Sequence, residues 1–215
     1  MEAARVCLIH GAATTSQVWA RVIAALPVEF SISCPDRPSS GDLDTEIEAL
    51  ADAVDGAIVV GVSGGATLCL ELAARGLPFR IALAHEPAVG SLLPELLTPM
   101  ASAFAAGGVD AFATTLYGPS WTSEMAPPDP AAVARDLRMF QAFESGPPLT
   151  PVITSVGANS PPIRHEAARR LAEKYDLPLR VLAGAEHAVH LDHPAILAAH
   201  IMQLARTSAR ARNGR

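Results

Sequence analysis

Charged and aromatic residues are scarce in this sequence, and lysine is almost absent. Only 18% of the residues are charged and 50% are hydrophobic, a balance that excludes a largely disordered chain. The net charge of −6 has the wrong sign for a nucleic-acid surface, and the only basic cluster is the arginine-rich C-terminus. Lys174 is the only lysine, which we attribute to coding bias and not to chemistry.

Long apolar runs and a leader-like start are also missing. No run approaches the length of a membrane-spanning helix, and residues 1–5 have neither the charge nor the length of a signal peptide's start. The three cysteines, Cys7, Cys34 and Cys69, lie far apart in apolar surroundings without metal-ligand spacing. We therefore expect reduced, buried thiols in a cytoplasmic protein that has no metal site and no membrane partner.

The most informative stretch is 57–76, AIVVGVSGGATLCLELAARG. Residues 57–60 are typical of a strand buried on both faces, and 66–75 are typical of a helix that Gly76 ends. Between them Gly61-Val62-Ser63-Gly64-Gly65 matches G-x-S-x-G, a pattern that becomes meaningful between a strand and a helix. A sharp turn there would present the Ser63 hydroxyl above the sheet, beside the Gly64 N–H.

Three other interpretations of these glycines were weighed. A P-loop needs Lys-Ser/Thr after its last glycine, and this helix contains no lysine. The spacing of Gly61, Gly64 and Gly65 does not fit the dinucleotide fingerprint G-x-G-x-x-G. A tight turn with Ser63 as a helix N-cap stays open, but the flanking strand and helix favour a nucleophile.

Strand and helix patterns alternate along most of the chain. Because such alternation predicts right-handed crossovers, we expect a mostly parallel sheet of about six strands with helices on both faces, an α/β fold. We predict that Asp44 caps the second helix. The predicted strands are 5–9, 30–34, 57–60, 80–85, 152–156 and 179–182, and the predicted helices outside the insertion are 16–26, 45–54, 66–75, 163–175 and 195–206.

The alternation breaks between residues 88 and 148, where only helical patterns are found, over 91–106, 109–117 and 130–144. Their outward faces carry more Phe, Met and Leu than a solvated helix should. We interpret 88–148 as a helical cap inserted into a single domain of residues 1–206. Residues 207–215 form a polar tail that we expect to fray.

Chemically useful residues follow the predicted strands. In open α/β sheets the ligand crevice lies at the carboxyl ends of the strands, so these residues should share one crevice. They are His10, Ala12, Ser63, Glu86, Asn159 and His187.

Over residues 5–206 the sequence resembles proteins of the α/β-hydrolase fold. The resemblance implies Ser63 as the nucleophile, His187 as the general base, and the N–H groups of Ala12 and Gly64 as the oxyanion hole. The resemblance also implies a compact variant of this fold, because the fold's early strands are missing from this sequence. Four segments carry it: HGAATTSQVW from His10 to Trp19, the turn Gly61 to Gly65, Gly157-Ala158-Asn159-Ser160-Pro161, and Gly184-Ala185-Glu186-His187 with Leu191 and Pro194.

Elementary chemistry also requires a nucleophile and a separate general base. A serine hydroxyl needs a base to remove its proton, and histidine has the suitable pKa. His187 fits the family pattern better than His190 or His193, which lead into a helix. We expect His10 to orient the oxyanion loop by bonding backbone groups.

The third member of the triad is open. The family usually carries aspartate where this chain has Asn159, and an amide holds no charge to stabilise an imidazolium. Some relatives place the acid after the strand that follows the nucleophile, where Glu86 stands. The Gly-x-x-Ser-Pro surroundings favour Asn159 slightly, and the other interpretation of Glu86 is a carboxylate that accepts backbone N–H bonds.

The resulting hypothesis is a serine hydrolase that cleaves a small ester, lactone or thioester without a cofactor. Its alternatives are a lyase and a small-molecule-binding pseudoenzyme on the same fold, with Asn159 as the lesion or as an engineered change. The sequence does not predict an oligomeric state. We expect the substrate pocket to involve His10, Val62, Trp121, Met125 and Met139.

Overall fold

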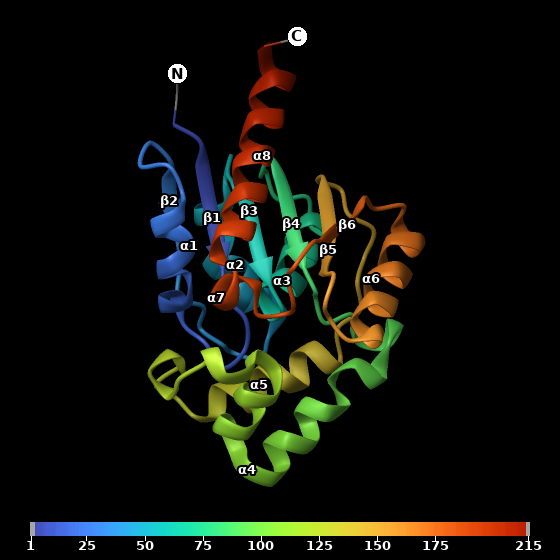
Figure 1. The fold of residues 1–215 in the computed structure, drawn as a ribbon. Helices are drawn as coiled ribbons and strands as arrows, with labels where there is room; N and C mark the ends of the chain where they lie inside the picture. The colour runs from blue at the N-terminus through green and yellow to red at the C-terminus, as the bar shows by residue number, and fades with distance from the viewer. Residues whose placement is uncertain (1–2, 214–215) are drawn as a thin grey trace.

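The computed structural model describes residues 3–213 and contains one six-stranded sheet in the order β2-β1-β3-β4-β5-β6. Every neighbouring pair of strands is parallel, so the predicted α/β class and strand number are confirmed (Figure 1). The strands are β1 (Arg5–Ile9), β2 (Ser31–Ser33), β3 (Ile58–Val62), β4 (Ile81–His85), β5 (Val152–Gly157) and β6 (Leu179–Leu182).

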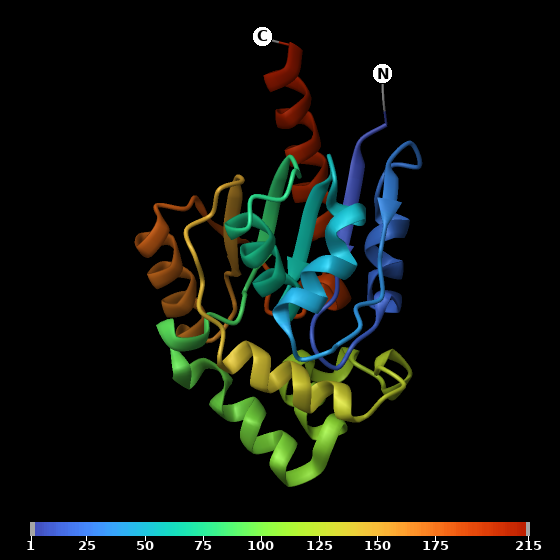
Figure 2. The same ribbon diagram turned by 180° about the vertical axis from the view of Figure 1, so that it is seen from behind.

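Helices cover both faces of the sheet. Helices α1 and α8 pack on each other over the face seen in Figure 1, and α2 and α3 cover the opposite face, seen in Figure 2. The central strand β3 is buried along its whole length, as its β-branched sequence predicts. The bounds are η1 (Ser16–Trp19), α1 (Ala20–Ala25), α2 (Leu43–Val54), α3 (Gly64–Ala74), α6 (Pro162–Tyr175), α7 (Val189–Asp192) and α8 (Pro194–Asn213).

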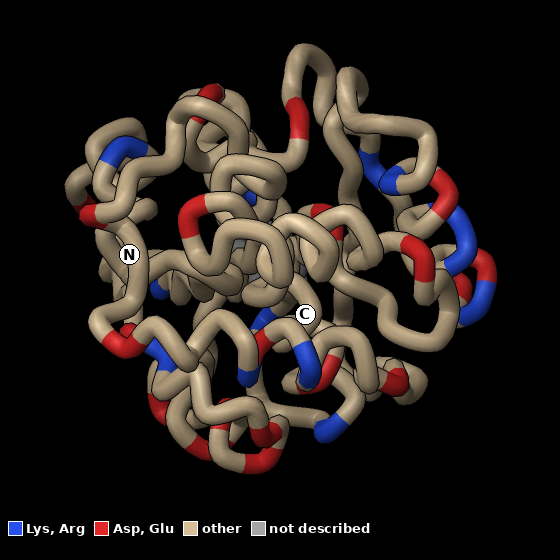
Figure 3. Tube along the Cα trace, turned by 90° about the horizontal axis from the view of Figure 1, so that it is seen from below, with Lys and Arg blue, Asp and Glu red and all other residues tan. Residues whose placement is uncertain are grey.

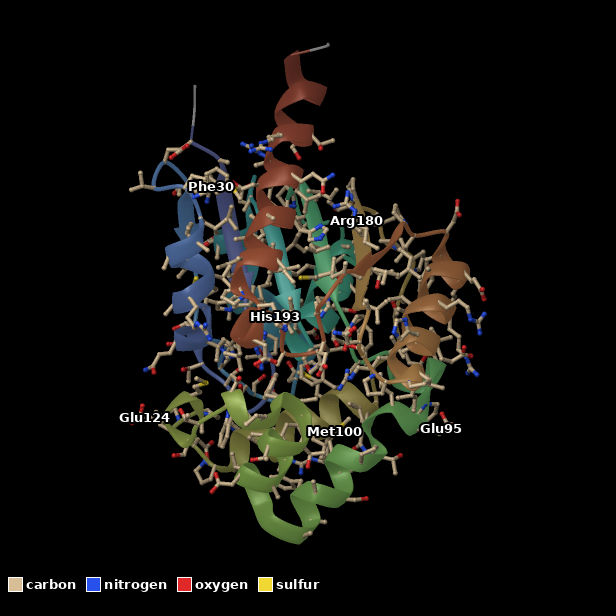
Figure 4. All side chains as sticks on the ribbon, viewed as in Figure 1. Phe30, Glu95, Met100, Glu124, Arg180 and His193 are labelled. Atoms are coloured by element: carbon tan, nitrogen blue, oxygen red, sulfur yellow. The ribbon has the colours of Figure 1, made fainter. Side chains whose placement is uncertain are left out.

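The segment predicted as a cap lies across the carboxyl ends of the strands, while both described chain ends point the other way (Figures 1 and 2). Its longest helix breaks at Gly107 and Gly108, where the sequence predicts a boundary between two helices. Met100 lies on this cap below the strands (Figure 4). The elements are η2 (Gly90–Leu92), η3 (Pro94–Leu97), α4 (Thr98–Tyr117), η4 (Gly118–Ser120), η5 (Ser123–Met125) and α5 (Ala131–Gln141).

Part of the cap is strongly apolar. By length and composition alone, the 27 helical residues Pro94–Ser120 could cross a membrane, with a mean hydropathy of 1.3 over an 18-residue window. They do not form one continuous helix, because the backbone is non-helical at Gly107 and Gly108. Seen from the cap side, acidic and basic residues are interspersed around the periphery of the molecule (Figure 3).

Two local predictions were wrong. Asp42, not Asp44, caps α2, because its carboxylate accepts hydrogen bonds from the N–H and the hydroxyl of Thr45, at 2.9 and 2.8 Å. Residues 207–213 were expected to fray but continue α8, which agrees with the high helix propensity of alanine and arginine. Residues 214 and 215 of the predicted tail lie outside the described residues.

All three cysteines are free thiols, as predicted. Cys7 and Cys69 are buried, whereas Cys34 is partly exposed. Burial raises the pKa of Cys7 to about 11, so this thiol stays protonated near neutral pH.

The turn after β3 depends on two glycines that lie against neighbouring backbone. A Cβ at Gly65 would overlap the Ile9 carbonyl, and one at Gly61 would overlap the Gly65 backbone. Helix α3 can therefore pass this close to β1 and β3 only if both positions lack a side chain.

We predict that Gly65→Ala lowers the free energy of unfolding by about 3 kcal/mol or more, because backbone must move to admit the methyl group. Urea denaturation measures this. The control is Gly184→Ala, where φ is +74° and only the tip of Ile196 is near, so only left-handed strain of about 1–2 kcal/mol is expected. Equal losses in the two variants would contradict the close approach.

Candidate active site

Ser63 occupies a strained turn between β3 and α3. Its backbone has φ +57° and ψ −124°, a combination that L-residues rarely adopt and that occurs at functional sites. The Ser63 N–H donates to the His85 carbonyl at 3.0 Å, and the Ser63 carbonyl accepts from the Thr67 N–H at 3.0 Å. The side chain is 8% exposed at the end of the sheet that the cap covers.

His187 contacts a carboxylate through one ring nitrogen. Its Nδ1 lies 2.9 Å from Oε2 of Glu86, and both side chains are buried. An ionised carboxylate only accepts hydrogen bonds, so Nδ1 carries the proton and Nε2 keeps its lone pair. Within residues 3–213, Nε2 is buried and has no hydrogen-bond partner. This is the state of a base that is ready to accept a proton.

Three hydrogen bonds and an ion pair hold the Glu86 carboxylate. Oε1 accepts from the Gly157 N–H at 2.8 Å and from the Ser160 hydroxyl. Oε2 is shared by His187 and Nε of Arg164, which lies 3.3 Å away. Burial by itself would raise the pKa of Glu86, but the His187 hydrogen bond and nearby positive charge hold it well below its usual value.

The preference for Asn159 over Glu86 at the acid position was wrong about the geometry. Asn159 is exposed, and its backbone N–H donates to the Ala185 carbonyl at 3.0 Å. The surrounding Gly-x-x-Ser-Pro segment instead supplies two donors, Gly157 and Ser160, to the Glu86 carboxylate. The family-like loop is therefore present, but the carboxylate it holds comes from the end of β4.

Burial has a strong effect on His187. Burial and the Arg164 guanidinium lower its pKa to about 4, although the Glu86 carboxylate opposes this change. Imidazole is therefore neutral near pH 7, as a general base must be.

A backbone N–H of the loop from His10 to Thr14 lies close to Gly64, the residue after Ser63. The Ala12 and Gly64 N–H groups have no acceptor among residues 3–213. The Ala12 nitrogen lies 3.3 Å from the point where a Gly64 Cβ would stand, so the two donors are neighbours. Paired backbone donors of this kind can stabilise a negative oxygen, which is the role expected of an oxyanion hole.

Side chains fix the carbonyls of the same loop. His10 accepts the Arg37 N–H at Nε2 and therefore donates from Nδ1 to the Gly11 carbonyl at 3.0 Å. This confirms that His10 bonds backbone groups and does not face the reaction as a base. Tyr117 and Trp121 of the cap donate to the Ala12 and Ala13 carbonyls at 2.8 and 2.9 Å.

Arg37 ties this loop to the body and to the cap. Its guanidinium donates to the His10 and Gly11 carbonyls, and it pairs with Glu46 of α2 at 2.8 Å and Asp136 of α5 at 2.7 Å. All three charged side chains are fully or almost fully buried. Removing one partner from such a buried group leaves an uncompensated charge, which costs about 3–5 kcal/mol.

Tyr117 lies close to both Ser63 and His187. Its ring stacks on His187 with centroids 5.8 Å apart. Its hydroxyl and the Ser63 Cβ both lie near the empty Cβ position of Gly11, at 2.5 and 3.2 Å. Burial raises the pKa of Tyr117 to about 12, so the phenol is a neutral hydrogen-bond donor beside the serine.

A cavity of about 380 Å³ opens beside His187. Residues from the first half of the cap line one side of the cavity. The loop after β6 and the start of α6 line the rest. The lining residues used below are Met100, Leu116, Tyr117, Ile163, Arg164 and His187.

The expected pocket residues do not line this cavity. Val62 is buried in the sheet, and Met139 packs in the core. The indole N–H of Trp121 donates a hydrogen bond to the Ala13 carbonyl. Met125 is partly buried against the same core, and His10 instead lines a second cavity of about 270 Å³. The apolar side chains of these cap segments pack against the body of the protein. The cavity is lined instead by the first half of the cap.

The two competing histidines are placed differently from His187. His190 is buried against the Trp19 ring, with centroids 5.1 Å apart, and His193 is exposed. Of these three histidines, only His187 contacts a carboxylate.

The family model described as "Alpha/beta hydrolase family" matches residues 8–200. The chain belongs to the alpha/beta hydrolase family. The match includes the Ser63 turn, Glu86 and His187, and the parallel sheet has the order described above. Membership supports a hydrolase in general and leaves the reaction mechanism and the substrate to be tested.

Solved structures show the same fold at low identity. A lipase-esterase related protein from Clostridium acetobutylicum is 14% identical with a TM-score of 0.73, over 94% of this hydrolase and 95% of that chain. The enol-lactonase from Burkholderia xenovorans is 18% identical with a TM-score of 0.69, over 94% and 91%. Naproxen esterase from Bacillus subtilis is 16% identical with a TM-score of 0.65, over 94% and 84%. A search of curated proteins found no match.

Sequence reasoning missed three residues of this alpha/beta hydrolase site: Tyr117, Ser160 and Arg164. Ser160 was part of a recognised segment, and its hydroxyl could have been assigned to Glu86 once that carboxylate was chosen. Tyr117 and Arg164 sit on ordinary helical patterns, and no local signal distinguishes them from other helix residues.

We predict that His187 titrates well below the ordinary histidine pKa of 6.5, near the value of about 4, when followed by NMR of its ring. Because the folded state binds this proton less readily than the unfolded state, His187 stabilises the fold fully above about pH 6.5. That contribution falls as the pH drops from 6.5 toward 4. A ring pKa of His187 at the ordinary value of 6.5 would contradict the burial argument.

Proposed function

We propose that this protein is a serine hydrolase that cleaves a small ester, lactone or thioester through an acyl-enzyme. Ser63 attacks the acyl carbon while its proton passes to Nε2 of His187. That proton then goes to the leaving group as the bond to the acyl carbon breaks. Water repeats the sequence against the acyl-enzyme and releases the acid. These steps need only side chains, backbone donors and water.

The observation that carries the proposal is the hydrogen bond between Nδ1 of His187 and Oε2 of Glu86, at 2.9 Å. It sets the tautomer that leaves Nε2 unprotonated, and it offers a negative charge to the imidazolium that forms during attack. The strained Ser63 turn and the free Ala12 and Gly64 N–H groups supply the other two parts of the machinery.

Ser63 and Nε2 of His187 are not hydrogen-bonded in this structure, and Tyr117 lines the cavity whereas Ser63 does not. Such contacts often tighten only when substrate binds. A lyase or a binding protein would share this arrangement, but the main argument for lost turnover was an amide at the acid position. Glu86 removes that argument, so hydrolysis is the better supported function. A small molecule as the sole partner and a cytoplasmic location stay predictions.

We predict that a fluorophosphonate probe labels the wild-type protein and that Ser63→Ala abolishes labelling and ester hydrolysis. The melting temperature should change little, because the backbone and Gly61 and Gly65 set the turn. Intact-mass spectrometry measures labelling, and Ser91→Ala at an exposed serine should label like wild type. Retention of most of the activity in Ser63→Ala would remove this residue from the mechanism.

We predict that Glu86→Gln lowers kcat by about 10⁴, the scale of an acid-to-amide change in a serine triad. The matched control is Asn159→Ala, for which kcat should stay within about twofold, since that side chain is exposed. Circular dichroism checks that both variants fold. A large loss in Asn159→Ala with little change in Glu86→Gln would reverse the assignment of the acid.

A further inference from the structure

The cavity beside His187 has an uneven chemical character. Most of its wall is apolar and includes Met100, Leu116 and Ile163. Among the described residues that line it, Arg164 has the only cationic side chain. A single cation in an apolar wall fixes where a polar end of a ligand can lie.

Only the Nε atom of the Arg164 guanidinium contacts a charged partner in the described residues. Its side chain is 10% exposed, and Nε lies 3.3 Å from Oε2 of Glu86. Within residues 3–213, neither Nη atom donates a hydrogen bond to another residue, although the residue lines the cavity. An arginine buried only to neutralise Glu86 would not need to leave its forked end without protein acceptors.

The backbone next to Arg164 adds a second donor. Ile163 and Arg164 belong to the first turn of the 14-residue helix α6, and both line the cavity. The Ile163 N–H has no acceptor in the described part of the chain. The positive end of the α6 dipole and the Arg164 guanidinium therefore adjoin the same cavity, and each of them favours the binding of an anion.

Resting on the proposed hydrolase function, we propose that the substrate is an ester, lactone or thioester that carries its own carboxylate, and that the Nη edge of Arg164 binds this carboxylate. The fork of two N–H donors matches a carboxylate in two parallel hydrogen bonds. The apolar wall accommodates the chain between the carboxylate and the reacting carbonyl.

Two acids limit how much negative charge the ligand carries. Glu186 and Asp192 also line the cavity, the first exposed and the second partly exposed. Water screens them more than it screens the buried Arg164, but each would repel a second ligand carboxylate. The favoured substrate therefore has one free carboxylate besides the acyl group that reacts.

Arg164 also touches Glu86, so its loss affects catalysis on any substrate. A role confined to Glu86 and His187 would lower kcat/KM equally for charged and neutral substrates. A role in binding a carboxylate lowers it more for the charged one. The informative quantity is the ratio of kcat/KM between two substrates that differ in that charge and by one methyl group.

The test uses para-nitrophenyl hydrogen glutarate and its neutral methyl ester, methyl para-nitrophenyl glutarate. Wild type should prefer the anionic compound. In Arg164→Met that preference should fall by about tenfold to a hundredfold, mainly through KM, and Arg164→Lys should fall between the two. The control is Arg169→Met, an exposed, ion-paired arginine on the same helix, which should keep the wild-type ratio.

A binding measurement separates this proposal from the nucleophile assignment. Ser63→Ala protein is titrated calorimetrically with methyl hydrogen glutarate and with dimethyl glutarate. The anion should bind more tightly, and adding Arg164→Met should remove the difference. An unchanged substrate ratio, or equal binding of the two esters, overturns the carboxylate site. Failed labelling of Ser63 with intact anion selectivity would overturn only the hydrolase mechanism.

Discussion

The buried carboxylate of Glu86 is the group on which the rest of the site depends. A carboxylate at this depth is stable only if donors surround it, and the donors come from β5, the following loop, α6 and His187. Those bonds fix the imidazole tautomer, the position of Arg164 and the path of the loop after β5. The carboxylate therefore organises structure and chemistry together, and no neighbouring group could change without leaving part of it unpaired.

Most of the fold follows from patterns that a single sequence displays. Alternating buried strands and amphipathic helices predicted the six parallel strands, and Gly61 to Gly65 predicted the sharp turn at Ser63, because both signals are local. The acid was harder. Its identity depends on whether the end of β4 or the end of β5 reaches His187, which is a matter of three-dimensional distance. The Gly-x-x-Ser-Pro surroundings favoured Asn159, but the group that lies 2.9 Å from Nδ1 of His187 is the Glu86 carboxylate.

The cap shows why composition predicts a role less well than position. Its apolar excess predicted a substrate pocket around Trp121 and Met139, but Trp121 donates a hydrogen bond to the Ala13 carbonyl and Met139 packs in the core. The cavity instead lies under Met100 and Leu116, on helix positions with no distinguishing sequence. Which apolar face holds a ligand depends on what the folded body leaves uncovered, and that information is not local.

The buried ion pairs of Arg37 involve only one half of the cap. Asp136 on α5 anchors one end to the oxyanion loop, whereas the Gly107–Gly108 break in α4 stands apart from those bonds. For protein engineers this defines a natural place to exchange sequence. Replacing the sequence between residues 98 and 115 should change the shape of the cavity beside His187. Asp136, Tyr117 and Trp121 must be kept, because they hold the loop from His10 to Thr14 in place. Grafts that replace α5 would have to supply a new counter-ion as well.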